Sequence, residues 1–195
     1  MQYDLLFSNF KRHGVILNEA ECEVVLSKLK YRKIKKKQLI CHAGEICQFY
    51  GFVLSGSTRM YSIDEYGAEH ITYFAMEDWW IADIASFISQ VPSLLNIETI
   101  EETEMVYFTK ESREEVLSEV PKLEKYFRIL FEKSLVANHQ RLLNTLSLSA
   151  AEKYVEFVKK YENLIGRIPQ VQIASFLGIS PEHLSKIRSE LIRNK

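Results

Sequence analysis

Short runs of β-branched and aromatic residues alternate with turn residues between about positions 31 and 108. Such runs are typical of strands, and the polar residues and glycines between them are typical of turns. The clearest strand candidates are residues 49–54, 57–63, 69–74 and 105–108. Residues 64–67 predict a tight hairpin turn, because Gly67 can adopt a positive φ without a steric clash. The pattern therefore predicts an antiparallel β domain.

Two segments before this region also carry a pattern. Residues 19–29 place Val24, Val25 and Leu29 behind a candidate cap at Asn18, which predicts a short surface helix. Residues 31–37 are mostly lysine and arginine. We interpret them as a solvated edge strand whose lysines discourage further pairing, with contact to DNA as the alternative.

A long helix is predicted after the β domain. The stretch from Pro121 to Leu146 contains no further glycine or proline and would span about 39 Å as one helix. Its apolar residues form two stripes, one of Leu123, Phe127 and Leu130 and the other of Phe131, Leu135, Asn138, Leu142 and Leu146. Two stripes need two partners, which predicts contact with the β domain and with the same helix of a second subunit. The alternative is a helix enclosed in a monomeric core. Asn138 either fixes the register of the helix pair or faces a ligand pocket.

The C-terminal residues predict a helix-turn-helix. Ser149 and Glu152 form a capping box that starts a helix running to about residue 163. Two shorter helices follow at residues 170–177 and 181–187, with Ala174 small enough for a close crossing and Gly178 suited to the left-handed turn. This spacing is typical of motifs that place their second helix in the major groove of DNA.

The second of these helices carries the candidate DNA-binding residues. They are polar side chains that could contact base edges or phosphates: Glu182, His183, Ser185, Lys186, Arg188, Ser189 and Arg193. Arg188 and Arg193 fit phosphate contacts or support of the fold better than base contacts. The alternative is a helical hairpin in a core, which would carry apolar residues on both sides.

Charge is distributed unevenly along the 195 residues. The whole chain has a formal net charge of −1, but residues 166–195 hold five basic and two acidic side chains. A local basic unit favours a local acidic partner such as DNA.

No run of about 18 apolar residues is present, so no membrane partner is expected. Three cysteines without a disulfide framework fit a cytoplasmic protein.

These features together resemble the cyclic-AMP receptor protein (Crp/Fnr) superfamily of bacterial transcription regulators. The resemblance rests on Gly44, Phe52-Val53-Leu54-Ser55-Gly56, Arg59, Tyr61, the hairpin at 64–67, Ala174, Leu177-Gly178-Ile179-Ser180, Glu182 and Ser185-Lys186. It implies an α+β fold with a jelly-roll type β-roll sensor domain (1–120), a dimerisation helix (121–148) and a helix-turn-helix domain (149–195).

The same resemblance implies a function in transcription regulation. It predicts a homodimer that binds palindromic operator DNA, with RNA polymerase and a small-molecule effector as further partners. Glu182 and Lys186 fall at base-contacting positions, Lys186 standing where the family usually has arginine. The family's hairpin after the recognition helix has no counterpart before Lys195. We therefore expect weaker phosphate contacts.

The residues that would hold a cyclic-nucleotide phosphate depart from the family pattern. A Gly-Glu pair and a later Arg with Ser or Thr are replaced by Ala82-Asp83 and Ser93-Leu94-Leu95, and no lysine or arginine lies between Ile81 and Thr109. A buried phosphate without a cation is unfavourable, so we expect no cyclic-AMP binding. The aromatic and apolar residues of this segment either fill the core or line an effector pocket. The pocket candidates are Arg59, Trp80, Asp83, Ser93, Leu94 and Asn138.

Other cofactors and activities find little support in the sequence. Cys22, Cys41 and Cys47 do not provide the four thiolates of an iron–sulfur cluster, and Cys41-His42 with Cys47 lacks a fourth metal ligand. The five histidines have no evident nucleophile partner, so we expect no enzyme and no cofactor. The rival hypothesis is a ligand-binding or protein-interaction module that no longer reads specific DNA.

Overall fold

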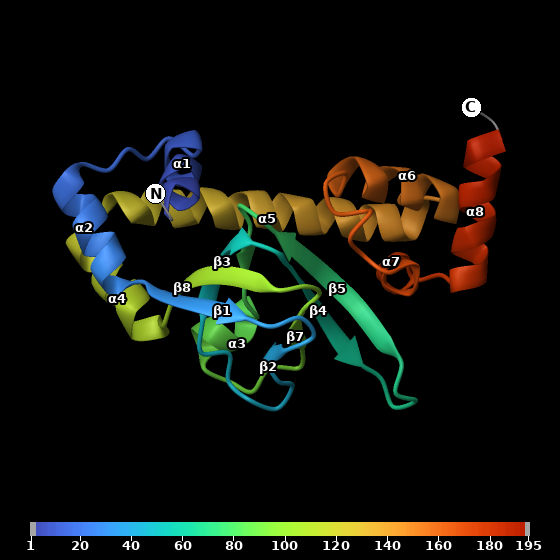
Figure 1. Ribbon diagram of the computed structural model, residues 1–195, viewed down its shortest axis with the longest axis horizontal. Helices are drawn as coiled ribbons and strands as arrows, with labels where there is room; N and C mark the ends of the chain where they lie inside the picture. The colour runs from blue at the N-terminus through green and yellow to red at the C-terminus, as the bar shows by residue number, and fades with distance from the viewer. Residues whose placement is uncertain (1–2, 194–195) are drawn as a thin grey trace. The chain divides into compact units, whose positions relative to one another are not determined.

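The computed structural model describes residues 3–193. Helices flank a central run of strands along the chain (Figure 1). The helices are α1 (Asp4–Arg12), α2 (Glu19–Lys28), α3 (Ile84–Ser89), α4 (Lys110–Glu119), α5 (Lys122–Ser147), α6 (Ala150–Lys160), α7 (Gln170–Leu177) and α8 (Pro181–Arg193). The strands are β1 (Lys30–Ile34), β2 (Leu39–Cys41), β3 (Tyr50–Ser55), β4 (Ser57–Ile63), β5 (Glu69–Met76), β6 (Trp80–Ile81), β7 (Asn96–Thr99) and β8 (Thr103–Phe108).

The strands form two four-stranded sheets, in the orders β1-β8-β3-β6 and β2-β7-β4-β5. The pairings of β3 with β8 and with β6 are antiparallel, as are those of β1 with β8 and of β2 with β7. The predicted antiparallel β domain and its four clearest strands are therefore confirmed. β1 lies at an edge of its sheet and is largely exposed, which agrees with the predicted edge strand.

The chain folds into two compact units. The first consists of residues 1–60 and 74–133, and the second of residues 61–73 and 134–195. α5 is one helix, as predicted, but its first half belongs to the first unit and its second half to the second. The domain boundaries expected after residues 120 and 148 stay a prediction.

The capping residues predicted from the sequence cap their helices in the structure. The Asn18 side chain accepts a hydrogen bond from the Glu21 amide, and the Glu21 carboxylate accepts one from the Asn18 amide. Ser149 and Glu152 form the same reciprocal pair at the start of α6. However, α6 ends at Lys160 and not near residue 163, because the chain turns at Tyr161, whose buried ring packs against Phe157.

A buried polar network ties three elements of the first unit together. Trp80 Nε1 donates to the Tyr126 hydroxyl at 2.7 Å, and that hydroxyl donates to Asn9 Oδ1 at 2.6 Å. Asn9 Nδ2 in turn donates to Asp78 Oδ1 at 2.9 Å. Because buried polar groups are costly when unpaired, this chain of hydrogen bonds fixes α1 and the start of α5 against the β-roll.

Candidate functional site

α7 and α8 lie side by side across a short turn in the second unit (Figure 1). Gly178 caps α7 at φ 70°, in the left-handed region, and the crossing residue Ala174 is fully buried. The Ser180 hydroxyl accepts a hydrogen bond from the His183 amide at 3.2 Å and so caps α8. These features are those predicted for a helix-turn-helix.

α8 has one buried face and one exposed face. Leu184 and Ile187 are buried, whereas Glu182 and Lys186, one turn apart, are exposed. The remaining candidate DNA-binding residues are exposed at His183, Ser185, Ser189 and Arg193 and half-buried at Arg188. Hydrogen bonds from its own amide and from Ser180 lower the pKa of Glu182, so its carboxylate is ionised and accepts hydrogen bonds at neutral pH.

The second apolar stripe of α5 is exposed within one chain from Leu135 onward, whereas its first member, Phe131, is half-buried and stacks on Tyr50. Leu135, Leu142 and Leu146 are 62%, 55% and 76% exposed, and Asn138 lies exposed among them. Leu123, Tyr126 and Phe127, at the start of the same helix, are buried in the first unit. The start of α5 is therefore covered by its own chain, whereas the side that carries Leu135, Leu142 and Leu146 is not.

The residues that replace the family's phosphate-binding pattern in the sequence analysis, Asp83 and Ser93, hydrogen-bond within the chain. Asp83 caps α3, because its Oδ1 accepts hydrogen bonds from the Ala85 and Ser86 amides at 3.1 and 3.3 Å. Its Oδ2 accepts a hydrogen bond from the Ser93 hydroxyl at 2.7 Å. A carboxylate thus occupies the amides at the start of α3.

The other predicted pocket residues of the first unit have contacts of their own. Arg59 is buried and bound to Glu98, with Arg59 Nη2 2.6 Å from Glu98 Oε2. Trp80 stacks on Tyr50, with ring centroids 4.7 Å apart. The Leu94 side chain is 83% exposed. A hydrogen bond thus joins Asp83 and Ser93, while Arg59 pairs with Glu98 and Trp80 stacks on Tyr50.

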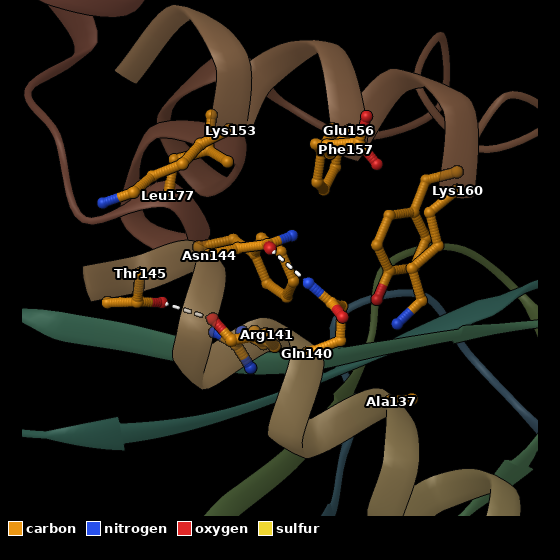
Figure 2. A pocket seen from close by; sticks show the side chains of 12 residues that line it. Ala137, Gln140, Arg141, Asn144, Thr145, Lys153, Glu156, Phe157, Lys160 and Leu177 are labelled. Carbon is orange, nitrogen blue, oxygen red and sulfur yellow. Dashed lines mark hydrogen bonds between the residues drawn. The ribbon is translucent and has the colours of Figure 1, made fainter. Parts of the chain in front are cut away.

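A cavity that the sequence did not predict lies within the second unit, between α5, α6 and α7 (Figure 2). Its volume is about 270 Å³, and its lining residues are Ala137, Gln140, Arg141, Asn144, Thr145, Lys153, Glu156, Phe157, Lys160, Tyr161, Phe176 and Leu177. Figure 2 shows Gln140 and Asn144 of α5 on the side that faces Phe157 and Lys160 of α6, with Arg141 close to the strands below. One sequence signal points here, since Arg141 is the only lysine or arginine between Lys133 and Lys153.

Arg141 joins three elements of this unit. Its guanidinium donates to the backbone carbonyls of Ile71 and Thr72 on β5, and its Cζ lies 4.1 Å from the centroid of the Phe176 ring on α7. Burial lowers the pKa of Arg141. On the same side of the unit, the Ser175 hydroxyl donates to the Glu69 carbonyl at 2.5 Å. The hairpin residues 61–73 are therefore anchored to α7.

Neither a metal site nor a membrane span emerges from residues 3–193. No group of three or more His, Cys, Asp or Glu side chains in this range is arranged to bind a metal ion. No helix within it has both the length and the apolar character needed to cross a membrane.

Cys41 and Cys47 are buried thiols that hydrogen-bond to each other, and this contact lowers the pKa of Cys47 and raises that of Cys41.

Comparison with known proteins identifies the β-roll. Residues 31–120 match the family model of the cyclic nucleotide-binding domain. No curated protein shows a significant sequence match to the chain.

Solved structures share the fold over most of the chain. The c-di-GMP responsive global regulator CLP of Xanthomonas campestris has a TM-score of 0.73 at 13% identity, covering 91% of this chain and 93% of CLP. FixK2 of Bradyrhizobium japonicum has a TM-score of 0.74 at 17% identity, covering 85% of each chain. A Crp/Fnr family structure from Eubacterium rectale has a TM-score of 0.69 at 17% identity, covering 91% of this chain and 85% of that one. Residues 31–120 therefore match the cyclic nucleotide-binding domain, and the chain shares the fold of these solved structures, one of which is described as a regulator of the Crp/Fnr family.

Proposed function

We propose that the chain is a DNA-binding transcription regulator that acts as a homodimer and carries an effector-sensing β-roll. The observation that carries the proposal is the α7–α8 helix-turn-helix with its exposed polar face. The fold shared with known regulators supports the same role. A regulator of this kind acts on RNA polymerase and has no catalytic site of its own.

The exposed face of α8 provides groups suited to both base edges and the DNA backbone. Glu182 accepts a hydrogen bond from the amino group of cytosine, and Lys186 donates to the acceptors of guanine. Ser185, Ser189 and Arg193 extend the same face toward the end of the helix. The net positive charge of residues 166–195 favours approach to the phosphate backbone.

The homodimer proposal rests on the exposed stripe of α5. Three leucines more than half exposed, at 4-residue and 7-residue spacing, form a seam that pairing with a second copy would remove from water. A dimer with two-fold symmetry presents two recognition helices to two half-sites, which predicts a palindromic operator. Asn138 then fixes the register of the pair at some cost in stability.

The β-roll of this regulator does not use cyclic AMP in our proposal. The carboxylate of Asp83 already occupies the α3 amides that would face a phosphate, and it would repel the anion. Arg59, the one cation of the predicted pocket set, is bound to Glu98. The effector of this domain is a different small molecule, and no cofactor is required.

Selection of bound sequences from random double-stranded DNA tests the DNA-reading role. The proteins compared are wild type, Glu182→Ala, Lys186→Ala and the matched control Glu190→Ala, which removes an exposed carboxylate of α8 outside the candidate set. We expect wild type and the control to enrich the same palindrome. Each of the other two variants should lose about 1–3 kcal/mol of binding free energy and relax preference at its own base pair.

Two outcomes would contradict the proposal. If wild type enriches no palindrome, the rival module that does not read DNA is favoured. If all four proteins give the same sequence profile, Glu182 and Lys186 do not read bases. Sedimentation at micromolar concentration provides the separate test of oligomeric state, and a monomer there would refute the homodimer.

A further inference from the structure

We propose that the cavity between α5, α6 and α7 binds a small organic anion with a flat apolar body. All twelve lining residues belong to the second unit, so the site is contained in one compact body. Its volume of about 270 Å³ lies just below the range of about 300–1,000 Å³ common for ligand pockets. A ligand of one or two fused rings matches that size.

The charges that line the cavity favour an anion. Arg141, Lys153 and Lys160 contribute three positive charges against one carboxylate, Glu156. That carboxylate is engaged by Lys159, whose Nζ lies 2.7 Å from Glu156 Oε1. The lining therefore carries a net positive charge.

Arg141 is the strongest anchor for such an anion. Its hydrogen-bond acceptors are uncharged carbonyls, and over residues 3–193 no carboxylate forms an ion pair with it. A partly buried cation without a counter-charge gains more from an arriving anion than one already paired. The guanidinium also offers a planar fork that suits a carboxylate.

Lys160 adds a second positive charge to the same cavity. Its pKa is lowered, first because neighbouring atoms exclude water from the ammonium group and second because Arg141 repels it. Two mutually repelling cations therefore line the cavity. An anion between them would reduce this repulsion and stabilise both charged forms.

Aromatic rings provide the apolar wall. Phe157, Tyr161 and Phe176 pack together, with centroid separations from 4.8 to 5.6 Å, and Leu177 closes the wall from α7. Aromatic faces favour flat rings in stacked or edge-on arrangements. The cavity thus combines charge recognition at one side with a surface for a ring at the other.

Dimerisation would leave this cavity accessible. Ala137, Arg141 and Asn144 follow helical spacing along one side of α5, whereas Leu135, Leu142 and Leu146 follow it along the opposite side. The same helix can therefore pair with a second copy and still contact a ligand. α7 lines the cavity, so an occupied site would contact the helix-turn-helix directly.

Calorimetric titration with 1-naphthoate, combined with amide chemical-shift mapping, tests the proposal on the full chain without DNA. The matched ligand is 1-naphthamide, which keeps the ring and lacks the charge. We expect naphthoate to bind at one site per chain and to shift amides of α6, α7 and the second half of α5. Naphthamide should bind about tenfold more weakly or not at all, because the charge-assisted contact is missing.

Two variants and one control assign the site. Lys160→Gln and Arg141→Gln should each weaken naphthoate binding by about tenfold. Arg128→Gln makes the same change at an exposed position in the first half of α5, where Arg128 pairs with Glu132, and should leave the affinity unchanged. Since Arg141 also holds β5, Lys160→Gln keeps the test valid if Arg141→Gln fails to fold.

The proposal is overturned by any of three results. These are no saturable naphthoate binding, equal affinity for naphthoate and naphthamide, or shifts confined to the β-roll. Because no DNA is present, failure here leaves the proposed regulatory function to be judged by its own experiment.

Discussion

Each unit shields an arginine side chain from water, but the partners of the two guanidinium groups differ in charge. In the first unit, Arg59 is buried beside Glu98, and its guanidinium makes two contacts of 2.6 and 2.7 Å to one carboxylate oxygen. In the second unit, Arg141 lies over the Phe176 ring and donates only to backbone carbonyls. The charge of Arg59 is thus balanced by a carboxylate of its own unit, whereas the charge of Arg141 is held by uncharged groups.

The same contrast holds for the polar groups around each arginine. In the β-roll, the Ser93 hydroxyl donates a hydrogen bond to the Asp83 carboxylate. The cations beside the helical cavity face aromatic rings instead. This difference teaches that one unit can pair its polar groups with one another while the other packs its cations against aromatic rings.

Removing the counter-charge in the β-roll should have the largest effect. Glu98→Leu leaves the Arg59 guanidinium buried beside a side chain that cannot accept a hydrogen bond. We expect a loss of about 3–5 kcal/mol in the free energy of unfolding, measured by urea denaturation. The control Glu132→Gln breaks an exposed pair and should cost about 0–1 kcal/mol. Equal losses in both variants would show that the Arg59–Glu98 pair is not the balanced charge described above.

Breaking the polar network of the first unit should have the next largest effect. Tyr126→Phe removes the hydroxyl that accepts from Trp80 and donates to Asn9, and it leaves both partners buried. We expect a loss of about 1–3 kcal/mol by the same measurement. Tyr107→Phe, at a half-buried position of β8, is the matched control and should be close to neutral. A neutral Tyr126→Phe would mean that water or another donor replaces the hydroxyl.

A local cap of the helical unit should contribute less and should depend on pH. Ser149→Ala removes the capping box of α6 and should cost about 1 kcal/mol at neutral pH. Hydrogen bonds from the Ser149 hydroxyl and amide lower the pKa of Glu152 below its ordinary value of 4.5. A carboxyl group whose pKa is lower in the folded state stabilises the fold at pH values above its ordinary pKa. This stabilisation is lost as the pH falls through the lowered pKa of the folded state. The difference between wild type and variant should therefore shrink in acid, and a difference that grows there would contradict this assignment.

The smallest expected effect is none at all. Cyclic AMP and cyclic GMP should leave the melting temperature unchanged, because a ligand raises it only by binding the folded state. The Asp83 carboxylate at the start of α3 is the physical reason. A clear thermal shift would show that the comparison between the units is wrong, and Arg59 would be the first residue to test as the phosphate-binding cation.

Local signals in the sequence predicted much of the fold. Asn18, Ser149 and Gly178 each act on backbone groups within a few residues, so their roles follow from short-range geometry. The turn between α7 and α8 and the exposed face of α8 could be predicted for the same reason. The stripe at Leu135, Leu142 and Leu146 was also evident, because helical spacing alone places these residues on one side.

The amino-acid sequence alone determined where helices begin, where the hairpin turns and which faces are apolar, because those depend on neighbours along the chain. The tertiary structure alone decided that Arg141 meets Phe176 and the carbonyls of β5, since these groups are far apart in sequence. It likewise decided that Asp83 binds Ser93 while Leu94 points to solvent. Such contacts depend on how the chain closes long loops and packs distant elements, and no local pattern of residue types encodes that geometry.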